Sequence, residues 1–152
     1  MYIRMRASVL LVDDNAVQAA IRQTILKRAG YDVIVALSPE RALEQLKNND
    51  FATTVGLVIT DHIMPGMTGA NLVRGLRQAY PSLPVMVISG LEEAESEYQG
   101  LDVLFRVKPL LPEALLCDVH SLLSFAEDPG LEPPPMIDPS GSTDDRPARP
   151  VR

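Results

Sequence analysis

Short apolar runs alternate with stretches of helical periodicity along most of this chain, and that alternation limits the possible folds more than any other feature. Each run is a few residues long and bounded by polar residues, which is typical of strands buried on both faces of a parallel sheet. Strands that alternate with helices predict an α/β fold, with helices on both faces of a parallel sheet. The predicted strands cover residues 7–12, 32–37, 57–60, 84–89 and 102–107.

The segments between these runs carry apolar residues at intervals of three and four, as one face of a helix does. The first helix is predicted over 16–29, with Gly30 as its stop signal. The second begins at Ser38-Pro39, a hydroxyl N-cap followed by proline at the first helical position. Further helices are predicted up to Pro81, over the short acidic segment 92–99 and from Pro112.

The same periodicity predicts which helix faces are buried. The predicted inner face of the first helix consists of Val17, Ala20, Ile21, Ile25 and Ala29. The predicted inner face of the last helix consists of Leu115, Leu116, Val119, Leu122 and Leu123.

A carboxylate ends the central strand. Residues 57–60 run directly into Asp61, and the chain then turns at Pro65-Gly66. In open α/β sheets the carboxyl ends of parallel strands share one edge, where ligands bind. Three other strands bring polar side chains to the same edge, namely Asp13, Asp14, Ser89 and Lys108. The sequence therefore predicts a cleft that holds three carboxylates, a hydroxyl and an ammonium group.

These groups together suit phosphoryl transfer. Three adjacent carboxylates repel one another, and an oxygen-only set with open positions suits Mg²⁺ or Mn²⁺, which takes phosphate oxygens as further ligands. Lys108 adds a positive charge and Ser89 a hydroxyl donor. Each residue alone has a plainer interpretation, because Asp13 and Asp14 could cap a helix, Ser89 could start a turn and Lys108 could be solvated. These separate interpretations would all have to hold at the ends of four strands at once, so they explain the pattern poorly.

With these residues in place, the sequence resembles the receiver domain of two-component response regulators over about residues 7–126. The resemblance implies a flavodoxin-like, doubly wound fold with a five-stranded parallel sheet in the order 2-1-3-4-5. The residues that carry it are Asp13-Asp14, Asp61 in Thr-Asp-His-Ile-Met-Pro-Gly-Met-Thr-Gly, Ser89 in Val-Ile-Ser-Gly, and Lys108-Pro109.

The resemblance also implies how the acidic residues work. Asp61 would be the phosphoacceptor, and Mg²⁺ would be held by Asp13, Asp14, Asp61 and the backbone carbonyl of Ile63. Lys108, followed by a cis peptide bond to proline, would pair with Asp61 and then with the phosphoryl group.

A switch and two kinds of partner are implied as well. Ser89 would bond a phosphoryl oxygen, and Phe105 would be the aromatic switch residue, although Phe105 could instead simply pack. A histidine kinase or phosphotransfer protein would donate the phosphoryl group, and an unknown downstream protein would read the change. The protein would then be a regulator, not an enzyme in the ordinary sense.

The segment between Ser89 and Lys108 departs from the family pattern, since it is shorter by about one helical turn. Its helix carries Glu92, Glu93, Glu95 and Glu97, which we interpret as a solvated face. The family uses this helix, the fifth strand and the last helix for dimerisation and output, so the oligomeric state and the output surface stay open.

Four further residues, two apolar side chains and two histidines, could affect the chemistry of this cleft. Ile63 and Leu91 lie two residues past Asp61 and Ser89, and their apolar side chains predict restricted entry of water and a long-lived aspartyl phosphate. His62 and His120 are interpreted as ordinary residues without a phosphocarrier role, with an effect on the pH response of a loop as the only modest function.

Composition sets the remaining expectations. The 152 residues fit one domain, and the formal net charge of −6 argues against general binding of nucleic acid or anionic membrane. The single cysteine, Cys117, excludes an internal disulfide, and neither a signal peptide nor a membrane-spanning run is visible, so a cytoplasmic protein is expected. Residues 1–6 are an N-terminal extension. Residues 127–152, with seven of the 13 prolines, are predicted to form a disordered tail that is too short and polar for a DNA-binding domain.

Two other functions compete with the phosphoacceptor. A hydrolase of the haloacid-dehalogenase type also uses an aspartate nucleophile and Mg²⁺, but it needs a second aspartate two residues later, where this chain has Ile63. A receiver-fold module that binds partners without phosphorylation remains the second alternative.

Overall fold

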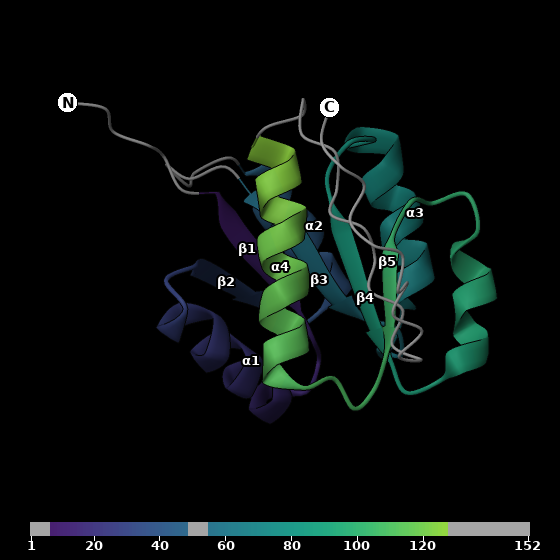
Figure 1. Ribbon diagram of the computed structural model, residues 1–152. Coiled ribbons are helices and arrows are strands. Elements are labelled where there is room, and N and C mark those ends of the chain that lie inside the picture. Colours follow the sequence, from purple (N-terminus) through teal and green to yellow (C-terminus); the bar gives the residue numbers. More distant parts are fainter. Residues whose placement is uncertain (1–6, 49–54, 128–152) are drawn as a thin grey trace, which may run out of the picture.

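The five predicted strands form one parallel sheet in the computed structural model, which describes residues 7–48 and 55–127 (Figure 1). The strand order is β2-β1-β3-β4-β5, which confirms the flavodoxin-like order 2-1-3-4-5. The predicted extension over 1–6 and the predicted tail, apart from Glu127, lie outside the described residues. The strands are β1 (Ser8–Val12), β2 (Asp32–Ala36), β3 (Val55–Asp61), β4 (Val85–Ser89) and β5 (Leu104–Val107).

Helices cover both faces of the sheet, with α1 and α4 on one side and α2 and α3 on the other (Figure 1). Alternate residues of the strands supply the two cores, as the period of two requires. In β1, for example, Val9 and Leu11 pack under α1 and α4, whereas Leu10 and Val12 pack under α2 and α3. The helices are α1 (Ala16–Arg28), α2 (Pro39–Lys47), α3 (Gly69–Ala79) and α4 (Pro112–Glu127), with a 3₁₀ helix, η1 (Glu92–Tyr98).

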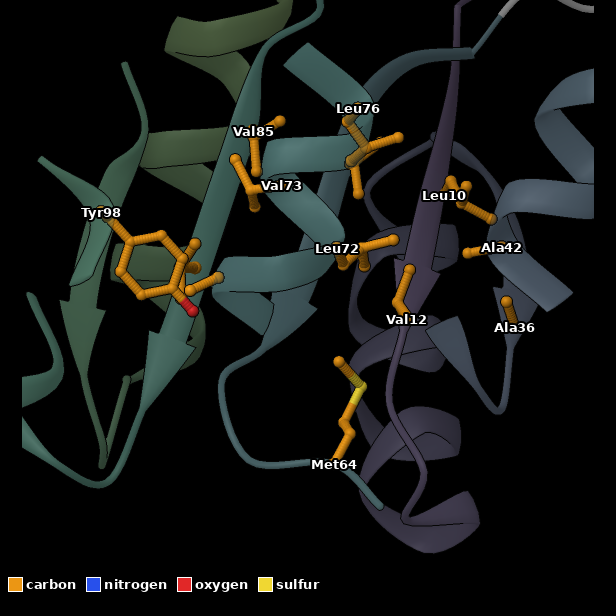
Figure 2. Packing of buried hydrophobic residues seen from close by; sticks show 13 residues of the cluster. Leu10, Val12, Ala36, Ala42, Met64, Leu72, Val73, Leu76, Val85 and Tyr98 are labelled. Carbon is orange, nitrogen blue, oxygen red and sulfur yellow. The ribbon is translucent and has the colours of Figure 1, made fainter. Parts of the chain in front are cut away.

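The core beneath α2 and α3 also anchors the loop that follows Asp61. Met64 is buried in that loop and belongs to the same cluster as Val12 and Leu72 (Figure 2). Full burial of a side chain of this size stabilises a fold by about 1.5–3 kcal/mol. The loop is therefore held against the sheet next to the carboxylate.

The predicted inner face of α1 is wrong except at Ile25, which is half-buried against the core beneath α1 and α4. The helix buries Ala19, Arg22 and Leu26, whereas Val17 is 71% and Ile21 56% exposed. The physical reason is Arg22, whose charged end finds carboxylate partners at the end of the sheet. Its presence on the buried face turns the helix away from the orientation that the apolar residues alone suggest.

The predicted inner face of α4 is correct, because Leu115, Val119 and Leu123 are buried against the sheet. The acidic segment is helical as predicted, but it forms the tighter 3₁₀ helix over Glu92–Tyr98. None of the helices within 7–48 and 55–127 is long and apolar enough to cross a membrane.

Candidate functional site

Three carboxylates meet at the carboxyl edge of the sheet. Asp13 directly follows β1 and Asp61 is the last residue of β3, and both side chains are buried. Asp14, the next residue along from Asp13, is exposed. One carboxylate oxygen from each of the three lies within 4.8 Å of the others. The structure thus brings together the acidic residues that the sequence predicts.

Asp13 is held by backbone contacts and does not cap α1. Its N–H donates to the Ala36 carbonyl at 3.1 Å, and its Oδ1 accepts from the Asn15 N–H at 2.9 Å. Asn15 is the N-cap residue, and its side chain accepts from the Gln18 N–H at 3.0 Å. The plainer interpretation of Asp13 and Asp14 as helix caps is therefore not supported.

Lys108 reaches Asp61 from the carboxyl end of β5. Its Nζ lies 3.1 Å from Asp61 Oδ1. The Lys108 N–H donates to the Ser89 carbonyl at 2.7 Å, and the peptide bond to Pro109 is cis, as the resemblance implies. Lys108 is therefore not merely a solvated charge.

Ser89 is buried at the end of β4, and its hydroxyl is turned towards its own loop. The Oγ atom accepts from the Leu91 N–H at 2.9 Å and donates to the Leu91 carbonyl at 3.2 Å. A contact with a phosphoryl group on Asp61 would require this side chain to leave Leu91. The observed turn contacts match the plainer interpretation, and the switch role stays a prediction.

Phe105 lies on β5, half-buried against η1. Its ring centroid is 5.6 Å from that of Tyr98. Both rings line a hollow of about 540 Å³ between η1 and β5, which shares no residue with the acidic cluster. The structure therefore places Phe105 away from the carboxylates and beside η1.

His62, the residue after Asp61, connects β3 to η1. Its ring is buried, with Nδ1 2.6 Å from the Tyr98 hydroxyl and Nε2 3.2 Å from Glu97 Oε2. A neutral imidazole protonated at Nε2 satisfies both contacts, since Nε2–H donates to Glu97 and Nδ1 accepts from Tyr98. Burial raises the pKa of Tyr98, which keeps its hydroxyl a donor. The sequence interpretation missed this structural link.

Gly69 leaves room for the contact between His62 and Tyr98. A Cβ atom on Gly69 would lie 2.5 Å from the Asp61 carbonyl oxygen and 2.6 Å from the Tyr98 hydroxyl. Both distances are far inside van der Waals contact, so a side chain here would push α3 away from the strand end.

Arg22 is a second site residue that sequence interpretation missed. Its Nη1 lies 3.2 Å from Asp13 Oδ2 and 3.4 Å from Asp61 Oδ1. An arginine in a helix is ordinarily interpreted as solvent-exposed. The available signal was its spacing, because Ala19, Arg22 and Leu26 follow one another at three and four residues and so share one face.

The surroundings of Asp13 shift the pKa of its carboxyl group in both directions. Burial raises the pKa of its carboxyl from the ordinary 3.8 to about 6, and neighbouring Asp61 adds to the rise. The Asn15 N–H and the Arg22 guanidinium both favour the ionised form and lower the pKa.

The residues present fit a hard divalent cation. Two of the carboxylates are buried and the third, Asp14, is exposed, so the oxygen cluster has an open side. Carboxylate oxygens alone, without nitrogen or sulfur donors, favour Mg²⁺ or Mn²⁺ over softer metals. Asp13, Asp14 and Asp61 are the side chains that could hold it.

Comparison with known proteins agrees with this geometry. A putative two-component response regulator of Arabidopsis thaliana, ARR21, is 34% identical over 123 residues, covering 80% of this chain but 19% of the relative. The response regulator protein FleR of Pseudomonas aeruginosa is 36% identical over 133 residues, covering 84% of this chain and 27% of the relative. The chain thus spans about a fifth to a quarter of the length of these relatives.

Solved structures show the same fold. A response regulator receiver protein from Pseudomonas putida superposes with a TM-score of 0.70 at 31% identity, covering 78% of this chain and 98% of the other. A CheY-like receiver domain protein from Methanospirillum hungatei gives a TM-score of 0.74 at 23% identity, covering 82% and 99%. The response regulator receiver domain family matches residues 9–116, and the chain belongs to this family.

Proposed function

We propose that this protein is a phosphoacceptor in a two-component system or phosphorelay, and that Asp61 accepts a phosphoryl group from a phosphohistidine. One observation carries the proposal. The Asp61 carboxylate ends β3 beside those of Asp13 and Asp14, with the Lys108 ammonium 3.1 Å from its Oδ1. A nucleophilic oxygen, an acidic cation site and a fixed positive charge then meet at one point.

The proposed step is a single displacement at phosphorus. A carboxylate oxygen of Asp61 forms the new O–P bond as the N–P bond of the phosphohistidine breaks, and the imidazole nitrogen keeps the electron pair of that bond. Lys108 neutralises charge on the acceptor and then on the phosphoryl oxygens. Bound Mg²⁺, held by Asp13, Asp14, Asp61 and the Ile63 carbonyl, would supply further charge neutralisation.

The surroundings of the site favour a protein as the donor. The large apolar side chains that lie exposed in the described residues are concentrated near the carboxyl edge. Exposed apolar surface of this kind, rimmed by polar groups, marks protein contacts. A histidine kinase or phosphotransfer protein would bury it. The residues are Val17, Ile21, Leu37, Ile63, Leu91, Val107 and Leu111.

The phosphoryl group would act by shifting an equilibrium between two conformations. Ser89 would leave the Leu91 backbone to bond a phosphoryl oxygen, and Phe105 would change its packing beside η1. A downstream protein would then read the altered surface. The molecule would be a regulator that takes part in its own phosphorylation and dephosphorylation and turns over no other substrate.

Intact mass measures acceptance of the phosphoryl group. We expect the protein to gain one phosphoryl group when incubated with acetyl phosphate and Mg²⁺, and Asp61→Asn to gain none. Asp32→Asn is the matched control, because Asp32 is exposed at the opposite end of a strand, and it should gain one group. Equal gain by Asp61→Asn would reject Asp61 as the acceptor.

A phosphorylated histidine-kinase or phosphotransfer domain, mixed in place of acetyl phosphate, tests the proposed donor. No gain with either kind of donor would favour the alternative, a receiver-fold module that binds partners without phosphorylation. Membership of the receiver family leaves the haloacid-dehalogenase alternative without support.

A further inference from the structure

Arg22 on α1 places a positively charged side chain inside the acidic cluster. Arg22 is only 9% exposed, on the face of α1 that packs against the sheet. Its Nη1 lies 3.2 Å from Asp13 Oδ2 and 3.4 Å from Asp61 Oδ1. One guanidinium group therefore bridges the two buried carboxylates of the acidic cluster.

Gln18, one helical turn before Arg22, holds this arrangement. With its amide oriented to suit its neighbours, the oxygen accepts from Arg22 Nη2 at 3.0 Å and from Lys108 Nζ at 3.2 Å, and the nitrogen donates to Asp13 Oδ2 at 3.2 Å. A guanidinium is stable in a buried position only where its charge and N–H groups have partners. Gln18 and the two carboxylates provide them, so Arg22 is an integral part of the site.

A divalent cation held by Asp13 and Asp61 would compete with Arg22. The guanidinium uses one oxygen of each carboxylate, and a metal ion among these side chains would stand within a few ångströms of it. Like charges at such a separation in a buried site repel strongly. The arginine side chain is long and flexible enough to move its charged end towards water.

We propose that Arg22 is a resident cation which Mg²⁺ must displace from Asp13 and Asp61, and that Arg22 thereby weakens the affinity of the site for metal. This inference rests on the proposed Mg²⁺ site. Mg²⁺ would bind only to the fraction of molecules in which the guanidinium has withdrawn from the two carboxylates. The apparent dissociation constant is raised in inverse proportion to that fraction.

Calorimetric titration of the full chain with MgCl₂ tests the competition. We expect Arg22→Met, which keeps the apolar stem and removes the charge, to bind Mg²⁺ about tenfold more tightly than wild type, the gain expected if Arg22 occupies the site about nine-tenths of the time. Arg22→Lys keeps the charge on a shorter side chain and loses the Nη2 contact with Gln18, so its affinity should fall between the two. Arg41→Met is the control, because Arg41 is exposed on α2, and its affinity should match wild type.

Thermal unfolding gives a second readout that does not depend on phosphorylation. Without metal, Arg22→Met leaves the Asp13 carboxylate without its arginine partner, and Asp61 keeps only Lys108, so the midpoint of this variant should lie below that of wild type. Added Mg²⁺ should then raise the midpoint of Arg22→Met more than that of wild type, because at a given concentration a ligand that binds more tightly stabilises the folded state more.

The outcomes separate this inference from the proposed function. Equal or weaker Mg²⁺ binding by Arg22→Met would overturn the displacement and leave the metal site intact. Absence of Mg²⁺ binding in all four proteins would overturn the metal site and the displacement together, whereas acceptance at Asp61 is scored independently by mass. If Arg22→Met does not fold, Arg22→Lys decides the question, since tighter binding supports displacement and unchanged binding overturns it.

Discussion

Burial of Asp13 disfavours the ionised form of its carboxyl group. Its side chain is fully buried, faces a second carboxylate, and shares the Arg22 guanidinium with it. The folded state therefore binds a proton on Asp13 more tightly than the unfolded chain does, as the rise of its pKa to about 6 shows. In the absence of metal, the ionised form of Asp13 costs stability.

This cost predicts how stability depends on pH. Between the ordinary pKa of 3.8 and the folded value of about 6, the folded state holds more protons than the unfolded state, so the unfolding free energy falls as pH rises and then levels off. Metal-free wild type should lose up to about 3 kcal/mol across this window relative to Asp13→Asn. Urea unfolding at a series of pH values measures the difference. Equal pH dependence in the two proteins would refute the prediction, and Asp32→Asn should behave as wild type.

Ile63 and Leu91 are predicted to prolong the lifetime of the proposed aspartyl phosphate by restricting the entry of water. Their side chains are 63% and 41% exposed beside the site, and neither can hydrogen-bond an attacking water. Ile63→Asn should accelerate loss of the phosphoryl group roughly five- to tenfold, the effect of about one hydrogen bond to that water. Intact mass after removal of the donor gives the rate, with the exposed Ile21→Asn as control. Loss of the phosphoryl group in wild type as fast as in Ile63→Asn would disprove the predicted restriction of water entry.

At the scale of elements, the strands could be predicted from sequence more fully than the helices. The inner strands β1, β3 and β4 show as apolar runs because both of their faces are largely buried, whereas the edge strands β2 and β5 are only partly buried. The strand ends locate Asp13, Asp61, Ser89 and Lys108 without any knowledge of packing. The buried face of α1 could not be predicted in this way. It carries Arg22, whose partners come from β1 and β3, so the pattern within the helix alone contains no sign of them.

η1 is the other element whose role depends on contacts distant in sequence. Its short acidic sequence predicts only a solvated helix, and the four glutamates are indeed exposed. Tyr98, however, is buried, and joins His62, which directly follows β3, to Phe105 on β5. A histidine 36 residues away in the sequence is the partner of the Tyr98 hydroxyl, and nothing local in either segment indicates the pairing.

The Tyr98 hydroxyl should therefore contribute measurably to stability. Tyr98→Phe keeps the ring and leaves His62 Nδ1 buried without its partner, which should cost about 1–3 kcal/mol of unfolding free energy. Tyr80→Phe is the matched control, because the Tyr80 hydroxyl donates to the Leu46 carbonyl in a half-buried position, and its removal should cost less. Urea unfolding of both variants distinguishes the two. An equal loss of unfolding free energy in both variants would mean that the His62 contact contributes no more to stability than the Leu46 contact does.

At the scale of the whole molecule, parallel topology is what gathers the site. The three carboxylates, Lys108 and Ser89 come from four strand ends that lie far apart in sequence, and the strand order places β1, β3, β4 and β5 side by side. The exposed apolar side chains surround the same edge. Contacts then run from His62, the residue after Asp61, through Tyr98 to Phe105 and the hollow at η1.

The most direct measurement of the central claim is chemical identification of the phosphorylated residue. Borohydride reduces an aspartyl phosphate to homoserine, so the phosphorylated chain can be reduced, digested and sequenced by mass spectrometry. We predict homoserine at position 61 alone, dependent on both the phosphoryl donor and Mg²⁺. Homoserine in place of Asp13 or Asp14, or no homoserine in protein that has gained phosphoryl mass, would contradict the assignment of Asp61 as the phosphoacceptor.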